Sequence, residues 1–341
     1  MQLMQTRRDF VTVLSATGAA GVLGVRGAIA DEPPPEVTTI RIQREELDNS
    51  ICLAPEFVAE ELLRAEGFTD VRYVVTRSGP EFTEAFAQGE IDFGFMFAPG
   101  AVRRLDADVP ITVVAGVHSG CFELFVHESI RTVADLKGKR VGIPDVPGSA
   151  PHLYVSVMAA HVGLDPDRDI EWITTDDVAA PLELFVRGEI DAYLAFVPDF
   201  PELRGGKIGR AIVNMAMDKH WSHYFCCVCA GTTDFIREHP VATKRALRAI
   251  LKATDLCRTE PERAVRALVD GDFIKLRYQR ALQALNEIPW DSWRELDPED
   301  SLRFYALWLH EFGEIEATPN ALIAEGTDWR FLNELKRELK A

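Results

Sequence analysis

A seven-residue pattern occurs twice in this chain, 99 positions apart (Asp92 to Asp191). The first copy is Phe86-Ala87-Gln88-Gly89-Glu90-Ile91-Asp92, and the second is Phe185-Val186-Arg187-Gly188-Glu189-Ile190-Asp191. In each copy a helix would end at the glycine, and a short turn would lead into a buried strand. Each copy then continues to a Phe-x-Pro sequence, which starts at Phe97 in one and at Phe196 in the other. A single copy would be an ordinary helix-to-strand turn, but two copies with matched flanks predict two lobes built on one plan.

The hydrophobic periodicity alternates between about two and about 3.6 residues along the chain, which is typical of an α/β protein. A length of 341 residues is enough for two domains with separate cores. We expect strands near 39–42, 71–75, 91–97, 111–117, 122–126, 141–143, 170–173, 190–196, 212–213 and 225–230. After residue 240 the pattern is almost entirely helical, with expected helices near 240–257, 260–269, 277–286, 298–313 and 328–339.

The first thirty residues have the features of an export signal. Two adjacent arginines, Arg7 and Arg8, precede a moderately apolar stretch over 11–25, and a small-x-small sequence at its end would serve a signal peptidase. We therefore expect 1–30 to be a twin-arginine signal peptide and 31–36 to be a linker. The mature protein is then expected to work in the periplasm.

The composition excludes several classes of protein. The net charge is -17, from 37 basic and 54 acidic residues, and such an acidic surface repels nucleic-acid phosphates. Hydrophobic residues make up 47% of the chain and charged residues 27%, which is ordinary for a globular protein. Six cysteines are too few for a disulfide scaffold in a chain of this length.

Three segments carry a resemblance to a known family. They are Gly89-Glu90-Ile91-Asp92-Phe93-Gly94, Val133-Ala134-Asp135-Leu136-Lys137-Gly138-Lys139-Arg140-Val141-Gly142-Ile143 and Gly188-Glu189-Ile190-Asp191-Ala192. The chain resembles the periplasmic substrate-binding proteins of ABC importers, of the nitrate/sulfonate/taurine type. That family shares its fold with the fungal thiamine-pyrimidine synthase.

The resemblance implies a periplasmic binding protein type II fold, with two α/β lobes joined by two crossing strands and a helical C-terminal region. Mapped onto this chain, lobe I would comprise 37–119 plus 228–341, and lobe II would comprise 120–227. The implied function is capture of a small-molecule solute between the lobes and delivery to an inner-membrane ABC permease with its ATPase. The protein would work as a monomer, without a cofactor and without covalent chemistry.

The sequence leaves the solute open among sulfonates, carboxylates and pyrimidine-like compounds. Two other functions also remain open. The chain could be a solute sensor for a membrane receptor, or an enzyme similar to the pyrimidine synthase that uses its cysteine-rich run.

Ligands of open α/β sheets bind beyond the carboxyl ends of the strands, where helix N-termini supply unpaired amide donors. The candidate ligand-binding residues follow strands, begin helices or lie in the first crossing: Asn49, Ser50, Ser78, Gly79, Pro99, His118, Ser119, Gly148, Ser149, His152, Asp176 and Pro198. Gly148 and Ser149 are the strongest pair, because glycine lets the backbone approach an oxyanion and serine adds a hydroxyl donor. Ser149 could also cap its own helix, and His152 could either contact an anion or lie on the surface. Four aromatic residues suit the cleft wall and the core equally: Phe97, Phe122, Tyr154 and Phe196.

A cysteine-rich run, Cys226-Cys227-Val228-Cys229, lies in an expected strand. The fungal synthase has such a run at a comparable place, where it is associated with iron, but with four cysteines instead of three. On a regular strand Cys227 and Cys229 would face one side and Cys226 the other, so the three thiols would converge only across a bulge. We therefore expect these thiols to be packing residues and expect no metal or catalytic site.

Overall fold

The computed structural model describes residues 32–45, 50–76, 79–144, 147–175, 177 and 179–340. The expected signal peptide (1–30) and three candidate ligand-binding residues, Asn49, Ser78 and Asp176, lie outside the described residues. No helix in the described part of the chain combines the length and the hydropathy needed to cross a membrane.

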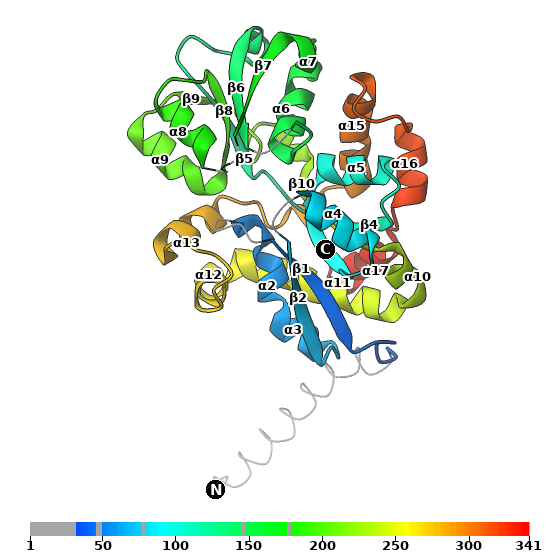
Figure 1. Cartoon of the computed structure of the whole chain (residues 1–341). Coiled ribbons are helices and arrows are strands. Elements are labelled where there is room, and N and C mark those ends of the chain that lie inside the picture. Colours follow the sequence, from blue (N-terminus) through cyan, green and yellow to red (C-terminus); the bar gives the residue numbers. More distant parts are fainter. Residues whose placement is uncertain are drawn as a thin grey trace, which may run out of the picture.

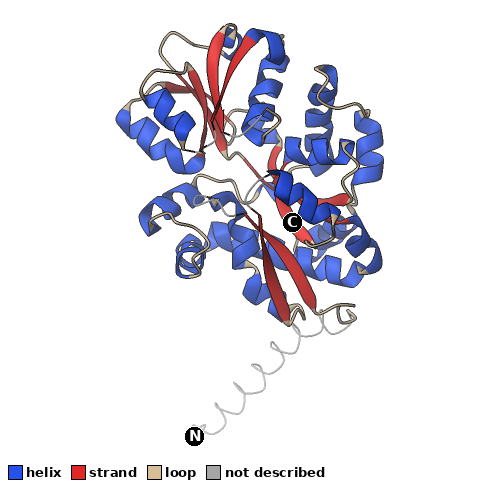
Figure 2. Ribbon diagram, viewed as in Figure 1, coloured by secondary structure: helices blue, strands red, loops and turns tan. Residues whose placement is uncertain are grey.

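Two sheets of five strands each organise the described residues (Figures 1 and 2). The first sheet has the order β2-β1-β3-β10-β4, and the second has the order β7-β6-β8-β5-β9. The strands of the first sheet are β1 (Thr39–Glu45), β2 (Asp70–Thr76), β3 (Phe93–Phe97), β4 (Ile111–Ser119) and β10 (Phe225–Thr232). Those of the second sheet are β5 (Phe122–Val126), β6 (Lys139–Pro144), β7 (Ile170–Thr175), β8 (Ala192–Phe196) and β9 (Arg210–Asn214).

The two sheets follow the same plan. In the first sheet β1 pairs in parallel with β2 and β3, and in the second β6 pairs in parallel with β7 and β8. The next strand in each order, β10 or β5, is antiparallel to both of its neighbours. This repetition confirms the prediction of two α/β lobes.

Helices connect the strands within each lobe. In the first lobe they are η1 (Ile51–Leu53), α2 (Ala54–Val58), α3 (Glu60–Ala65), α4 (Gly79–Ala87), α5 (Ala98–Asp106) and α10 (Thr233–Glu238). In the second lobe they are η2 (Val133–Leu136), α6 (Ala150–His161), α7 (Pro166–Asp169), α8 (Ala180–Val186), η3 (Val197–Asp199) and α9 (Phe200–Gly206). A further turn, η4 (Trp221–His223), precedes β10.

The C-terminal region is helical, as predicted, and packs mainly on the first lobe. Its helices are α11 (Pro240–Thr259), α12 (Pro261–Asp270), α13 (Tyr278–Asn286), α14 (Ser292–Glu295), α15 (Pro298–Glu311), α16 (Pro319–Gly326) and α17 (Arg330–Glu338). Helix α11 packs on α2 and α3, and α15 packs beside α5 (Figure 1). Helix α15 also contacts α6, and α13 contacts η3, so these two helices reach the second lobe.

The repeated sequence pattern makes the same contact in both lobes. The Asp92 carboxylate accepts the backbone N–H of Arg41 on β1 at 2.7 Å and also pairs with the Arg41 guanidinium. The Asp191 carboxylate accepts the backbone N–H of Arg140 on β6 at 2.9 Å and pairs with its guanidinium at 3.1 Å. In each copy the glycine before the strand has a positive φ, 67° and 73° respectively, which glycine adopts without strain. The motif therefore fastens β3 to β1 in one lobe and β8 to β6 in the other.

The described part of the expected linker lies against the first lobe. The Glu36 carboxylate accepts the backbone N–H groups of Val241 and Ala242 at 2.9 and 2.8 Å. These amides lie in the first turn of α11, where a helix has N–H groups without intrahelical partners. Glu32 forms an ion pair with Arg248 of the same helix at 2.8 Å. Residues 32–36 are thus held by α11.

Candidate functional site

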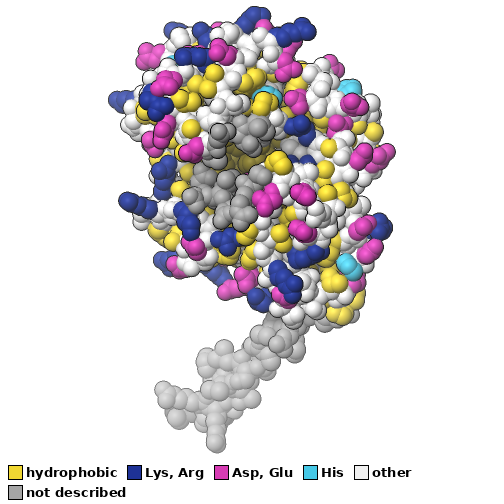
Figure 3. Space-filling view, in the orientation of Figure 1, with side chains coloured by type: hydrophobic (Ala, Val, Ile, Leu, Met, Phe, Trp, Pro, Cys, Tyr) yellow, Lys and Arg dark blue, Asp and Glu magenta, His cyan; other side chains and the backbone are white. Residues whose placement is uncertain are grey.

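Most of the described candidate residues lie beyond the carboxyl ends of the parallel strands, whereas His118 and Ser119 are the last two residues of β4 and His152 lies in α6. Ser50 follows β1, Gly79 begins α4 after β2, and Pro99 lies in the first turn of α5 after β3. In the second lobe the turn 148–149 separates β6 from α6, and Pro198 lies in η3 directly after β8. Ser50, Pro99 and Pro198 are buried, the turn 148–149 is half-buried, and Gly79 is exposed. In the orientation of Figure 1, the surface is hollowed between the two lobes, and hydrophobic side chains line the visible part of the hollow (Figure 3).

The Gly148–Ser149 turn has a defined backbone conformation. Gly148 has a φ of +90°, and its N–H donates to Nδ1 of His152 at 3.0 Å. The Ser149 hydroxyl donates to the carbonyl of Pro144 at 3.2 Å and does not cap α6. Ser149 therefore fastens the turn to the end of β6, which is a different role from the helix cap considered for it.

His152 is a buried residue of α6, with 2% of its surface exposed, and not the surface residue considered above. Its ring lies against Trp172 of β7, with the ring centroids 4.5 Å apart. Burial lowers the pKa of His152 to about 4, so the ring is neutral at neutral pH. In that state Nδ1 can accept the Gly148 N–H and so hold the turn.

The two crossing residues of the candidate set are engaged in internal hydrogen bonds. The ring nitrogens of His118 lie 3.2 Å from the carbonyl oxygens of Ser119 and Cys52. The Ser119 backbone N–H and hydroxyl lie 3.3 and 2.9 Å from the hydroxyl of Ser292 in α14. Both residues are buried and tie the crossing to the first lobe.

An aromatic cluster joins the two lobes. Phe97 at the end of β3 and Phe196 at the end of β8 occupy equivalent positions in the two sheets, and both are half-buried. Their ring centroids lie 5.3 and 5.4 Å from that of Phe122 at the start of β5. Tyr154 of α6 packs on Phe122 at 5.3 Å and donates its hydroxyl to the carbonyl of Cys226 at 2.7 Å. The half-buried rings can contact an organic solute, and the buried ones support them.

Arginines contact the candidate turns from across the gap between the lobes. Arg103 of α5 donates to the carbonyl of Gly148 at 3.0 Å, and Arg280 of α13 donates to the carbonyl of Pro198 at 2.9 Å. Arg103 also lies 3.6 Å from the Glu314 carboxylate. The sequence does not predict either arginine as a site residue, because neither belongs to a strand end or to the repeated motif. The sequence does contain one local indication of Arg103. Ala98 and Pro99 are typical of a helix start, and a helix that begins there contains Arg103 in its second turn.

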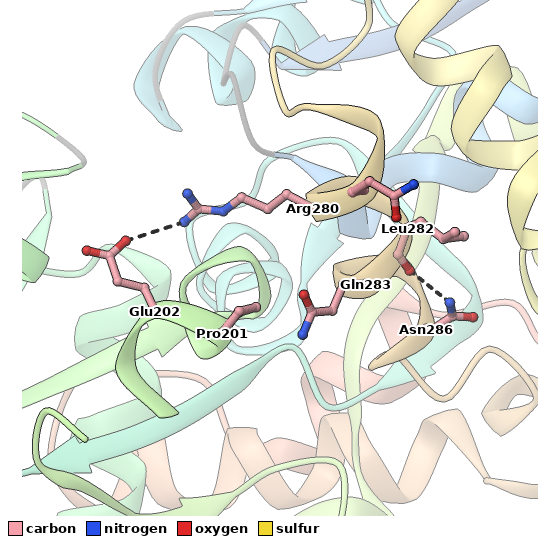
Figure 4. Close-up of a pocket in the computed structure, with 7 residues that line it drawn as sticks. Pro201, Glu202, Arg280, Leu282, Gln283 and Asn286 are labelled. Atoms are coloured by element: carbon pink, nitrogen blue, oxygen red, sulfur yellow. Dashed lines mark hydrogen bonds and ion pairs between the residues drawn. The ribbon is translucent and has the colours of Figure 1, made fainter. Parts of the chain in front are cut away.

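A cavity of about 580 Å³ opens between α9 and α13 (Figure 4). Polar and apolar groups both line it, and Arg280 is directed toward Glu202 across the gap at 3.9 Å. The lining residues are Pro201, Glu202, Gln279, Arg280, Leu282, Gln283 and Asn286. None of them belongs to the candidate set, but Arg280 also donates to the carbonyl of Pro198, so this cavity adjoins the predicted binding region.

The six cysteines are buried, and none of them forms a disulfide. Cys229, the last residue of the cysteine-rich run, does not join the thiols of the other segments, whereas the thiols of Cys52, Cys121 and Cys227 lie within 4.8 Å of one another. Hydrogen bonds with the thiols of Cys121 and Cys227 lower the pKa of Cys52. Cys52 and Cys121 are isolated in the sequence and belong to no spacing pattern, so the sequence alone does not predict that they meet Cys227.

Two kinds of known protein are similar to part of this chain in sequence. A protein of Brucella abortus (strain 2308), named as a binding protein, is 26% identical over 193 residues, which are 56% of this chain and 58% of that protein. A 4-amino-5-hydroxymethyl-2-methylpyrimidine phosphate synthase of Saccharomyces cerevisiae is 22% identical over 236 residues, which are 62% of this chain and 66% of the enzyme. The chain thus matches less than two thirds of the length of each relative.

Solved structures share the arrangement of the two lobes. The alkanesulfonate-binding protein of Xanthomonas axonopodis pv. citri, bound to MOPS, matches with a TM-score of 0.68 and 19% identity, over 86% of this chain and 99% of that chain. The periplasmic nitrate-binding protein of Synechocystis PCC 6803 matches with a TM-score of 0.74 and 15% identity, over 90% of each chain. The fold is therefore that of the type II periplasmic binding proteins. The chain belongs to the NMT1/THI5-like family, whose model matches residues 57–264.

Proposed function

We propose that this chain is the solute-binding component of an ABC import system and that it captures a small organic anion, a sulfonate or a carboxylate, between its lobes. Lobe I would comprise residues 37–119 together with residues 228–341. Lobe II would comprise residues 120–227. The mature protein would act as a periplasmic monomer after twin-arginine export and deliver its solute to an inner-membrane permease with its ATPase. It would carry out no covalent step.

The observation that carries the proposal is the contact between Arg103 of the first lobe and Gly148 of the second. The turn 148–149 precedes α6, a helix of 12 residues, and a helix N-terminus favours negative charge. A guanidinium beside that turn adds a fixed positive charge with several donors. A solute with an anionic group can therefore be held locally, although the whole chain has a net charge of -17.

The aromatic cluster supports an organic rather than a purely inorganic solute. Phe97 and Phe196 come from opposite lobes and meet on Phe122. A solute that contacts both half-buried rings gains these contacts only when the lobes are together. Differential contact of this kind is what shifts the equilibrium toward a closed form.

The test is a thermal-shift screen of the full chain against alkanesulfonates, aromatic and aliphatic carboxylates, nitrate and pyrimidines, followed by calorimetry with the best compound. We expect an organic anion to bind, and we expect Arg103→Gln and Ser149→Ala each to weaken its binding, Arg103→Gln by about 10- to 100-fold. Arg168→Gln, on the exposed helix α7, is the matched control and should bind normally. Tight binding of an uncharged pyrimidine instead, or unchanged affinity in both cleft variants, would contradict the proposal.

A further inference from the structure

Three thiols from distant parts of the sequence meet where the chain crosses between the lobes. Cys52 lies in η1 after β1, Cys121 lies between β4 and β5, and Cys227 lies near the start of β10. Their sulfur atoms are within 4.8 Å of one another, and the residues are 2%, 0% and 1% exposed. Among the described residues, no other set of three histidine, cysteine or acidic side chains brings its ligand atoms so close.

A bulge in β10 turns the strand toward this cluster. The pairing of β10 with β4 changes register between Phe225 and Cys227 and again between Cys227 and Val228. On a regular strand the adjacent side chains of Cys226 and Cys227 would point to opposite faces. Here the Cys227 sulfur lies with those of Cys52 and Cys121, while the Cys226 sulfur lies 3.5 Å from the hydroxyl of Tyr154. Bulges of this kind commonly re-aim side chains next to functional sites.

A buried histidine braces two of the cysteines. Nε2 of His118 lies 3.2 Å from the carbonyl oxygen of Cys52, and Nδ1 lies 3.6 Å from the sulfur of Cys121. The ring packs edge-on against Trp290, with centroids 4.8 Å apart. His118 therefore helps to hold the segments of Cys52 and Cys121 in place, through a contact with a backbone carbonyl as well as one with sulfur.

We propose that Cys52, Cys121 and Cys227 bind one thiophilic metal ion of the Zn(II) or Cu(I) class at the junction of the two lobes. Thiolate sulfur selects such ions, and the three-sulfur group contains no oxygen donor that would suit Mg²⁺ or Ca²⁺. A metal–sulfur bond of about 2.3 Å places the sulfurs of one site about 4 Å apart, so the observed cluster needs little movement. On binding, three S–H bonds are replaced by three metal–sulfur bonds, three protons pass to solvent, and no sulfur changes oxidation state.

The proposed ligands are not the cysteine-rich run 226–229, because only one of them, Cys227, belongs to that run. Cys229 is two residues beyond Cys227 and is also buried, but its thiol does not join the cluster. The metal would therefore connect η1 with both passages of the chain between the lobes, which a ligand set within β10 could not do. The metal site can be tested without knowing which solute the protein binds, so it does not depend on the proposed function.

The experiment uses the full chain, reduced and handled without oxygen, and titrates Zn(II) and Cu(I) separately in competition with a chromophoric chelator. We expect one equivalent of at least one of the two ions to bind. Cys52→Ser and Cys227→Ser should each lower the affinity by at least about 100-fold. Cys229→Ser is the matched control, since it removes a buried thiol from the same strand, and it should retain the site. Circular dichroism of the metal-free variants separates loss of ligand from loss of fold.

A second measurement keeps the proposal testable if either serine variant fails to fold. In the wild-type chain, bound metal should protect Cys52, Cys121 and Cys227 from alkylation, as read by peptide mass spectrometry, while Cys257 is unaffected by metal. The proposal is overturned if Zn(II) and Cu(I) both bind at less than about 0.1 equivalent. A disulfide among the three cysteines in the protein isolated under air-free conditions would also overturn it, as would a metal lost in Cys229→Ser but kept in Cys52→Ser.

Discussion

Asp92 and Asp191 make the same contact in different surroundings. Each carboxylate accepts the backbone N–H of an arginine on the neighbouring strand and binds that arginine's side chain. The Asp92 side chain is 3% exposed, whereas that of Asp191 is 29% exposed. Removing charge from the buried partner leaves groups that water cannot fully solvate, so the same substitution should cost more in the first lobe.

We predict that Asp92→Asn lowers the free energy of unfolding by about 2–3 kcal/mol and Asp191→Asn by about 1 kcal/mol, in urea titrations at pH 7. The hydrogen bonds and charge of Arg140 hold the pKa of Asp191 below its usual value. Its contribution is therefore present at neutral pH and is lost as the pH falls through that lowered pKa. Asp70→Asn, in the exposed pair with Arg72, is the control and should leave the free energy of unfolding nearly unchanged, because water screens that pair. Equal costs for Asp92→Asn and Asp70→Asn would show that burial does not govern the contact.

At this scale the sequence revealed one partner of each contact but not the other. The repeat identified Asp92 and Asp191, whereas Arg41 and Arg140 stand in strand sequences that do not resemble each other. The thiol cluster was missed for a related reason. A single cysteine has no spacing to read, and only the fold brings Cys52 and Cys121 to the β10 thiols.

Helix α6 shows how one element connects the core to the candidate site. Its first turn carries His152, which accepts the Gly148 N–H and packs on Trp172 of β7. Because the folded-state pKa is lowered to about 4 from an ordinary value of 6.5, the unfolded chain binds more protons between these pH values. This contribution to stability is complete above about pH 6.5 and decreases as the pH falls toward 4.

We predict that the wild-type chain loses up to about 3 kcal/mol of unfolding free energy through His152 between pH 7 and pH 4. In His152→Asn, whose amide oxygen can accept the Gly148 N–H, this part of the pH dependence should disappear. The measurement is urea unfolding followed by circular dichroism at half-unit pH steps, with the difference between the two proteins as the readout. Parallel curves for the two proteins from pH 7 to pH 4 would exclude a buried neutral His152.

Most elements were predictable because their hydrophobic periodicity matches their burial. The long C-terminal helices α11 and α15 were found close to their observed limits, and so were the buried strands β4 and β10. Short helices such as α5, α9 and α16 were missed, since each has seven to nine residues and contains both proline and glycine. Because α5 was not predicted, its residue Arg103 and the contact of Arg103 with Gly148 of the other lobe were not predicted either. In α6 the residues from His152 to Ala159 are all buried, so periodicity could not indicate which of them faces the candidate site.

For the whole molecule, the relative position of the lobes depends on the aromatic cluster and also on polar contacts between the segment of α13 in the first lobe and the segment of η3 and α9 in the second. Arg280 of α13 donates to the Pro198 carbonyl and lies 3.6 Å from Asp199, while Arg204 of α9 pairs with Glu287 at 2.9 Å (Figure 4 shows Arg280 beside this edge). The Arg204 and Arg280 side chains are more than a third exposed, so each ion pair contributes little by itself. The relative position of the lobes therefore rests on several contacts that are each weak, and the loss of one of them is expected to shift the lobes apart without unfolding either lobe.

We predict that Arg280→Gln shifts the solute-free chain toward an open form, because it weakens the bridge between α13 and η3 without disturbing either lobe's core. Hydrogen–deuterium exchange should become faster in peptides covering η3, α9 and α13, the radius of gyration from X-ray scattering should increase, and the melting temperature should change by less than about 2 °C. Arg277→Gln, at the exposed start of the same helix, should leave exchange in η3 and α9 unchanged. If Arg280→Gln exchanged like Arg277→Gln, the contacts of Arg280 with η3 would have no part in holding the lobes together.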